Sequence, residues 1–262
     1  MTYFLKRVFR KIRRLLQKSK NHFALQRGRK KIIAYKDLYR GKRCFIIGNG
    51  PSLRVEDLEK LKNEITFGTH RIYTLFGDTS WRPSFYFAQD YKMIKEEFKE
   101  ISAIAAKEKF IGMVPLYKYP YIQGATFANM ILKPFYPEPP EFSDDVSKEF
   151  YEGMTVTYMC LQFAVYMGFT EIILLGVDHN YSVVLKADGT VQVNDGVKNH
   201  FSADVGHTEA NPNDNLPQLD KTGLAYVTAN EYAKKHGVKI LNATRGGKLK
   251  AFERIDFDSI SF

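Results

Sequence analysis

The stretch RCFIIGNGPSLRVEDLEKL, from Arg43 to Leu61, decides the fold. It begins as an apolar run, breaks at residues 48–51 and continues as a charged, amphipathic segment. That order predicts a buried strand, a tight turn and a helix, which is the unit from which parallel α/β sheets are built. The fold of the chain is therefore expected to be α/β.

The turn in this stretch is a candidate nucleotide site. Glycines allow the backbone to approach a ligand closely, and the free N–H groups at a helix start attract an anion. The match to G-x-G-x-x-G is partial, because Leu53 stands at the third glycine position, and no Walker lysine follows. A turn that only joins strand to helix stays an open alternative. The candidate ligands are Gly48, Asn49, Gly50, Pro51 and Ser52.

The rest of the chain repeats the alternation of strand and helix. Apolar runs occur at 43–48, 65–69, 84–89, 108–114, 171–177 and 238–242, and helical patterns at 54–62, 91–107, 155–167 and 220–236. This predicts one doubly wound, Rossmann-like, mostly parallel sheet over residues 41–262, with the ligand beyond the carboxyl ends of the strands. Two segments, 115–150 and 179–219, lack the periodicity and are expected to be irregular loops, which in compact domains are lids, binding loops or disordered segments.

Composition bounds the class of protein. The 262 residues are 44% hydrophobic and contain no apolar run of the roughly 20 residues that span a bilayer, which predicts a folded, soluble or surface-bound protein. The two cysteines, Cys44 and Cys160, lie in apolar runs without zinc spacing, so buried thiols in a reducing cytoplasm are expected.

The positive charge is concentrated at the N-terminus. Residues 1–43 carry 16 Lys or Arg and one acidic residue, whereas residues 44–262 have a balance of −5. Within residues 1–40, apolar residues recur at helical spacing over 3–20 with basic residues between them, which predicts an amphipathic cationic helix. Such a helix can bind an anionic membrane surface, or it can pack on the domain or on a partner subunit. Nucleic-acid binding is not expected, because the acidic remainder offers no extended basic face.

A polar residue follows the strand predicted at 84–89. Asp90 stands directly after it and could bind Mg²⁺ or a sugar hydroxyl. Since the ligand of a parallel sheet lies beyond the carboxyl ends of its strands, Asp90 is a candidate ligand.

A second candidate anion site lies at the start of the helix predicted at 155–167. Gly153, Met154 and Thr155 precede an apolar helix whose first turn offers free N–H groups and a hydroxyl. The strand at 171–177 then ends in a polar cluster made of Asp178, His179, Asn180 and Tyr181. A capping aspartate with exposed neighbours is the alternative interpretation.

His200 and His207 are candidate general bases, because imidazole titrates near neutral pH, although each could equally be a bystander in a polar loop. No metal site is predicted. The Asp256-Phe257-Asp258 triplet has the form of a D-x-D metal motif, but it is short and lies at the extreme terminus, so whether it or Asp90 binds a metal stays open.

Four segments together resemble a family of bacterial proteins encoded in surface-polysaccharide gene clusters. They are FIIGNGPSL, EGMTVTYMCLQFAVYMGFTEIILLGVDHNYS, HFSADVGH and NATRGGKLKAFERIDFDSI, and the resemblance covers about residues 43–262. That family shares a superfamily with bacterial lipooligosaccharide sialyltransferases and archaeal 6-hydroxymethylpterin diphosphokinases. The resemblance implies a glycosyltransferase-A-like variant of the Rossmann-like fold.

The resemblance to the sialyltransferases also implies roles for residues. It implies that the turn at 48–52 binds the cytidine monophosphate of the donor, that Thr155 contacts the nucleotide, and that Tyr181, near Asp178, assists the departing phosphate. The catalytic histidine would correspond to His207 with His200 upstream, although the longer spacing leaves that assignment open. Thr69 and His70 stand where those enzymes have a donor-contacting asparagine, so the resemblance makes these two residues candidate donor contacts. A second phosphate-assisting tyrosine has no counterpart, and the donor's identity stays open.

The sequence thus predicts an inverting, metal-independent glycosyltransferase. It would move a sialic-acid-like sugar from a CMP-activated donor, without any further cofactor, to a cell-surface glycan or a lipid-linked glycan, at the inner face of the cell membrane. The alternatives are a Mg²⁺-dependent, diphosphokinase-like transfer from ATP to an alcohol and a non-catalytic nucleotide- or glycan-binding module. The oligomeric state stays open.

Overall fold

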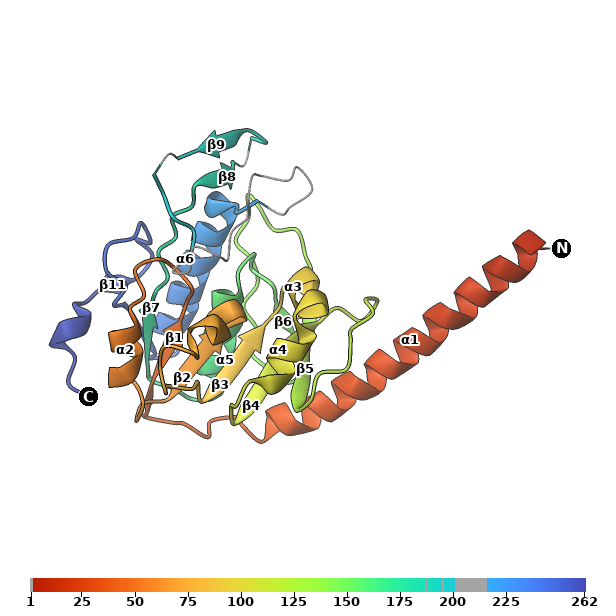
Figure 1. The fold of residues 1–262 in the computed structure, drawn as a ribbon, viewed down its shortest axis with the longest axis horizontal. Coiled ribbons are helices and arrows are strands. Elements are labelled where there is room, and N and C mark those ends of the chain that lie inside the picture. Colours follow the sequence, from red (N-terminus) through yellow and green to blue (C-terminus); the bar gives the residue numbers. More distant parts are fainter. Residues whose placement is uncertain (1, 187, 195, 201–215) are drawn as a thin grey trace.

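The computed structural model describes residues 2–186, 188–194, 196–200 and 216–262. Within these residues the chain forms a nine-stranded sheet in the order β11-β10-β7-β1-β2-β3-β4-β5-β6, and every neighbouring pair is parallel. The strands are β1 (Arg43–Ile47), β2 (Thr66–Thr69), β3 (Phe85–Ala88), β4 (Glu108–Met113), β5 (Ala125–Ile131), β6 (Phe150–Tyr151), β7 (Glu171–Leu175), β10 (Lys239–Asn242) and β11 (Glu253–Arg254). The predicted α/β, Rossmann-like, parallel architecture is confirmed (Figure 1).

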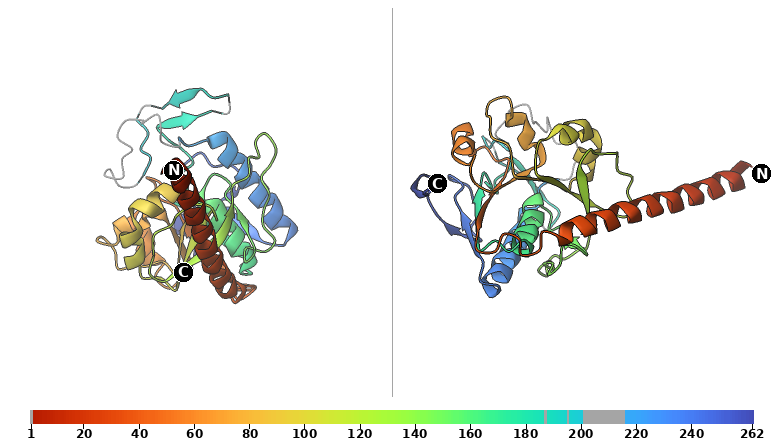
Figure 2. Two further views of the ribbon diagram at one scale, coloured as in Figure 1. Left: turned by 90° about the vertical axis from the view of Figure 1, so that its right-hand side faces the viewer. Right: turned by 90° about the horizontal axis from the view of Figure 1, so that it is seen from below.

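Helices cover both faces of this sheet (Figure 2). They are α1 (Thr2–Ile33), α2 (Val55–Lys60), α3 (Tyr91–Glu96), α4 (Phe98–Ala103), α5 (Val156–Tyr166) and α6 (Leu219–Lys235), with 3₁₀ turns at His70–Leu75 and Phe257–Ser259. The end of α1, with α5 and α6, packs on one face, and α2, α3 and α4 pack on the other.

Strand β1 shows why the sheet needs two covering layers. Cys44 and Ile46 point into the core with α5 and α6, whereas Phe45 and Ile47 point into the opposite core, and all four side chains are buried. A strand that buries both faces reads as a continuous apolar run, which is how it appears in the sequence. Cys44 and Cys160 are buried free thiols, as expected.

The N-terminal helix has two parts. Its first half projects away from the sheet (Figure 1), and its second half packs along β5. Asn21 Nδ2 donates to the carbonyl oxygens of Pro115 and Tyr117, at 2.7 and 2.8 Å. Because β6 is only two residues long, the second half of α1 covers the part of β5 that β6 leaves unpaired. No helix among the described residues is both long and apolar enough to span a bilayer.

Three expectations about local structure need correction. The segment 115–150 contains β5 and β6, and 179–219 contains the hairpin of β8 (Val183–Leu185) and β9 (Val191–Val193). Strand β5 was not recognisable because three of its seven residues are buried, and the α1 helix that packs along it is distant in sequence. The helix expected over 91–107 breaks at Glu97, whose carboxylate is held by Arg71 and Tyr73.

Candidate active site at the carboxyl edge of the sheet

The turns that follow β1 and β7 are locked together. The N–H of Gly48 donates to Leu175 O at 2.8 Å, and the N–H of Gly50 donates to Gly176 O at 2.9 Å. A Cβ on Gly48 would lie within 3.0 Å of the Gly176 carbonyl group, and a Cβ on Gly50 would overlap the carboxylate of Asp178. Both glycines are therefore required by the close approach of two backbone segments.

The turn at 48–52 also bonds to Asp178, and its expected binding of a nucleotide stays a prediction. The Ser52 hydroxyl donates to Asp178 Oδ2 at 2.7 Å, and the Ser52 N–H also favours the charged form of that carboxyl. Burial is the larger influence and raises the pKa of Asp178. The N–H groups of Gly48, Gly50 and Ser52 thus bond within the chain, Pro51 has none, and the carboxylate of Asp178 is an anion that the turn itself holds.

Asn49 and Gln89 instead present unpaired acceptors. Asn49 Nδ2 donates to Thr69 O and Oγ1 at 3.0 and 3.2 Å, and Thr69 Oγ1 donates to Ile47 O at 2.8 Å, so this network ties β1 to β2. Gln89, directly after β3, donates through Nε2 to Glu152 O at 3.0 Å. Asn49 Oδ1 and Gln89 Oε1 are buried, and neither has a hydrogen-bond partner within the part of the chain that the structure describes. Buried acceptors without donors are sites at which a hydroxyl or amine of a ligand can bind.

His70 is a neutral imidazole at this edge. Its Nε2 lies 3.5 Å from the N–H of Gln89, and its carbonyl accepts from the Tyr86 hydroxyl at 2.7 Å. Burial lowers the pKa of His70 to about 4, against the opposing charge of Asp90, and the charges of Arg71 and His200 lower it further. His200 is therefore near enough to His70 to act on it electrostatically. His207 lies outside the described residues.

Asp90 has a structural role that is evident from its contacts. It is the N-cap of α3, where Oδ1 accepts from the N–H of Met93 at 2.9 Å, and its side chain is exposed at the same edge as His70. This capping contact uses only Oδ1 of the Asp90 carboxylate.

The start of α5 forms a second group of candidate residues. Gly153 and Met154 have φ values of 56° and 60°, and a Cβ on Gly153 would overlap the ring of Tyr158. Thr155 is the N-cap of α5, and its Oγ1 accepts from the N–H of Thr157 at 3.3 Å and lies 3.4 Å from the Tyr226 hydroxyl. The positive end of the α5 dipole thus faces the carboxyl edge of the sheet.

The residues after β7 meet the same tyrosine. The ring of His179 packs edge-on against Tyr226, with the ring centroids 5.6 Å apart. Burial lowers the pKa of His179 to about 4, and Asp220 opposes this shift. Burial also raises the pKa of Tyr181, with Tyr226 and Asp178 adding to the effect, so the Tyr181 hydroxyl stays protonated at neutral pH. Tyr226 therefore joins the turn after β7 to the start of α5.

Three members of this site were missed from the sequence: Gln89, Glu152 and Tyr226. Burial and the charge of Asp90 raise the pKa of Glu152, and Lys221 opposes the shift. Glu152 also lines a cavity of about 310 Å³ beneath the loop at 133–141. Gln89 and Glu152 are the sequence neighbours of the predicted site residues Asp90 and Gly153, and this neighbourhood could have identified them as members of the site. Tyr226 gave none, because it lies within an amphipathic helix and reads as core.

Backbone strain marks the same edge. Among the described residues, four non-glycine residues have positive φ, and three of them follow strands of the site: His70 after β2, Met154 after β6 and His179 after β7. Left-handed backbone costs about 1 kcal/mol or more at such residues and is enriched where function fixes a geometry. The strain and the polar groups therefore coincide.

The terminal Asp-x-Asp triplet is used elsewhere. Asp256 caps the last 3₁₀ turn through the N–H of Asp258, at 3.1 Å, and Asp258 pairs with Lys60 and Arg245 at 2.9 and 3.0 Å. Within the described residues, no group of three His, Cys, Asp or Glu side chains is placed to hold a metal ion.

Comparison with known proteins gives one family. The profile described as 6-hydroxymethylpterin diphosphokinase MptE-like matches residues 16–184. The match begins inside α1, earlier than the resemblance expected from residue 43, and it stops before α6. No curated protein matches the chain.

Among solved structures, the MAf glycosyltransferase from Magnetospirillum magneticum AMB-1 is similar, with a TM-score of 0.46 and 12% sequence identity. The alignment covers 90% of this chain and 39% of that protein, so the chain spans well under half of its length.

Residues 16–184 are more than half of the chain and include the turns after β1, β2, β3, β6 and β7. The chain belongs to the 6-hydroxymethylpterin diphosphokinase MptE-like family.

Proposed function

We propose that the protein is an inverting, metal-independent glycosyltransferase that moves a sialic-acid-like sugar from a CMP-activated donor to a cell-surface glycan. The observation that carries the proposal is the double contact of Tyr226, with Thr155 at the start of α5 and with His179 after β7. These contacts bring the N-terminus of α5 and the imidazole of His179 together at one edge of the sheet.

The donor phosphate would bind at the start of α5. A helix N-terminus attracts an anion through its dipole, and Thr155 adds a hydroxyl at the same point. Tyr181, whose pKa is raised, would donate a hydrogen bond to the phosphate oxygen as negative charge develops on it. Asn49 Oδ1 and Gln89 Oε1 would accept hydrogen bonds from hydroxyl or amine groups of the activated sugar nucleotide. The ligand screen described below decides which nucleotide it is.

A histidine would act as general base. Its neutral nitrogen takes the proton of the acceptor hydroxyl, the hydroxyl oxygen bonds to the anomeric carbon, and the bond from that carbon to the phosphate oxygen breaks. The electron pair leaves with the nucleotide, and a single displacement inverts the anomeric centre. His200, near His70, and His207 are the two candidates.

The acceptor would enter beside Glu152. The cavity of about 310 Å³ joins Glu152 and Gly153 to the Pro-rich loop at 133–141. A lipid-linked acceptor fits a protein held at the inner face of the cell membrane, with residues 3–20 of α1 on an anionic surface. Leu15 and Leu16 are 58% exposed, which gives α1 an apolar side for such contact.

A second candidate function is the transfer of diphosphate from ATP to an alcohol with Mg²⁺. Two observations favour it: the description of the family, and the carboxylates of Asp90 and Glu152, which act on one another at the site. Mg²⁺ is commonly held by one or two carboxylates together with substrate phosphates. A non-catalytic nucleotide- or glycan-binding module is the third candidate.

A ligand screen and a chelation test separate these functions. A nucleotide at 100 times its Kd stabilises the fold by about 2.7 kcal/mol, so thermal shifts with CMP, CMP-sialic acid and ATP with Mg²⁺ rank the donors. Sialyl transfer that continues in EDTA supports the proposal. Stabilisation by ATP with Mg²⁺ alone, or turnover that EDTA abolishes, contradicts it.

The histidines separate catalysis from binding. His200→Gln or His207→Gln, whichever is the base, should lower kcat by roughly 10²- to 10⁴-fold and leave donor binding nearly unchanged. His236→Gln is the matched control, because His236 is exposed at the end of α6. A protein that binds CMP and tolerates both substitutions without loss of turnover has no histidine base.

A further inference from the structure

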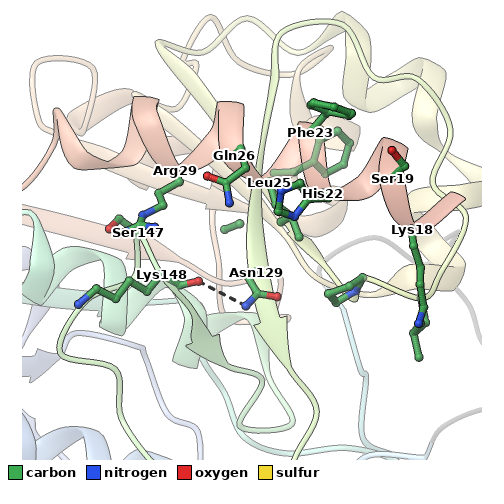
Figure 3. A pocket seen from close by; sticks show the side chains of 14 residues that line it. Lys18, Ser19, His22, Phe23, Leu25, Gln26, Arg29, Asn129, Ser147 and Lys148 are labelled. Atoms are coloured by element: carbon green, nitrogen blue, oxygen red, sulfur yellow. Dashed lines mark hydrogen bonds between the residues drawn. The ribbon is translucent and has the colours of Figure 1, made fainter. Parts of the chain in front are cut away.

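A second cavity, of about 730 Å³, lies between α1 and β5 (Figure 3), and its lining includes no residue of the candidate active site. Its lining carries basic side chains at both ends, and the side chains between them are apolar or uncharged polar apart from His22 (Figure 3). Lys18, His22, Arg29 and Lys148 supply the basic groups, and none of the 14 lining residues is acidic. The apolar lining is Phe23, Leu25, Pro115, Leu116, Phe127 and Ala128.

The close-up shows how the basic groups are distributed. Arg29, Ser147 and Lys148 lie at one end, and Lys18 lies at the other (Figure 3). Asn129 Nδ2 donates to Lys148 O at 3.3 Å, whereas its buried Oδ1 lacks a hydrogen-bond partner among the residues that the structure describes. Lys148 also pairs with Asp145, at 3.3 Å, so Arg29 is the stronger anchor for an anion at this end.

The position of the cavity on α1 indicates where its ligand comes from. Asn21 and Ile32 are buried on the docked side of the helix, and Leu16 and Phe23, seven residues apart on the opposite side, are 58% and 70% exposed. Lys18, His22 and Arg29 lie on a third side of α1, between the docked side and the exposed apolar side. A surface that contacts the exposed apolar side of α1 therefore meets the mouth of the cavity.

We propose that this cavity binds the phosphate headgroup and adjoining chain of an anionic membrane phospholipid. Arg and Lys match a phosphate in charge and geometry, and apolar side chains match the hydrocarbon next to it. The volume is that of a small-molecule site. The proposal goes beyond the proposed transferase chemistry, since it gives α1 a specific lipid site in place of a general attraction to anionic surfaces.

The test measures binding without turnover, so its outcome is independent of the enzymatic proposal. The full chain is titrated with dihexanoyl phosphatidylglycerol below its micelle concentration, with dihexanoyl phosphatidylcholine and glycerol 3-phosphate as comparisons. The proposal predicts saturable binding of the phosphatidylglycerol that is at least tenfold tighter than that of either comparison. Equal binding of glycerol 3-phosphate would show that the apolar lining is not used and would overturn the assignment to a lipid.

Paired charge variants test the location. The double variant Arg29→Gln with Lys148→Gln removes two charges from the lining of the cavity. The control variant Lys20→Gln with Lys30→Gln removes two exposed charges from α1 outside the cavity. The first pair should weaken binding at least tenfold, and the control pair by less than twofold. Equal losses would reduce the effect to net charge and refute the site.

Two further measurements test the apolar part of the cavity and the oligomeric state of the protein. Phe23→Ser with Leu116→Ser, at positions 70% and 67% exposed, should weaken lipid binding and leave the thermal midpoint nearly unchanged. Light scattering gives the mass in solution. A dimer that fails to bind the lipid would mean that a second copy, and not a phospholipid, covers this cavity.

Discussion

The Gly48→Ala substitution tests the interlocked turns directly. The added Cβ would lie 2.9 Å from the carbonyl carbon of Gly176, closer still to its oxygen, and 3.1 Å from Val177 Cγ2. Ordinary contact begins near 3.4 Å, so the turns after β1 and β7 must separate by roughly 1 Å. The hydrogen bonds from Gly48 N and Gly50 N, now 2.8 and 2.9 Å, would then exceed bonding distance.

The expected cost follows from these contacts. Two lost backbone hydrogen bonds cost about 0.5 to 1.5 kcal/mol each, and overpacking costs about 1 to 3 kcal/mol. Alanine also lowers the conformational entropy of the unfolded chain, which stabilises the folded state by about 0.4 to 1 kcal/mol. These contributions together span about 1 to 5.5 kcal/mol, so the free energy of unfolding should fall by about 3 kcal/mol, which lowers the melting temperature by roughly 6 to 12 °C at this chain length.

Gly77→Ala is the matched control. Gly77 has no heavy atom within 4 Å of a built Cβ, and its φ lies outside the left-handed region. Its stability should change by less than about 1 kcal/mol. Thermal and urea unfolding of both variants measure the difference. Melting temperatures within about 2 °C of each other would refute the close approach of these two turns.

Three further predictions concern other parts of the structure. The pKa values of His70 and His179 are about 4 in the folded chain and near 6.5 in the unfolded chain, so the unfolded chain binds more protons between these pH values. The free energy of unfolding should therefore fall as pH drops from 6.5 toward 4, by about 2 to 4 kcal/mol at pH 5. Urea titrations measure this fall, and a pH dependence that His70→Gln and His179→Gln leave unchanged would contradict the prediction. Asp90→Ala should cost about 1 kcal/mol of stability through loss of the α3 cap, and Asp90→Asn much less, as measured by urea unfolding; equal losses would argue against capping. Asn21→Ala should leave the two carbonyls that it binds without their donor and speed hydrogen exchange in the second half of α1 well beyond Lys20→Ala; unchanged exchange would mean that this contact does not dock the helix.

The sequence determined the parallel sheet and the edge at which the polar residues gather. Apolar runs that are buried on both faces identify strands, and parallel strands end together, so Asn49, Thr69, His70 and Asp178 could be assigned to one edge without coordinates. The helical period of residues 3–20 likewise predicted the start of α1. These features depend on local patterns, which is why the sequence carries them.

The tertiary structure alone decided which partner each group takes. The N–H groups of Gly48 and Gly50 donate to Leu175 and Gly176 at the end of β7, more than 120 residues away, and Ser52 donates to Asp178. Tyr226 reads as a core residue until α6 places it between Thr155 and His179. Strand β5 becomes recognisable only when α1 covers it. A hydrogen bond or a buried face depends on which neighbours folding brings together, and the local sequence does not contain that information.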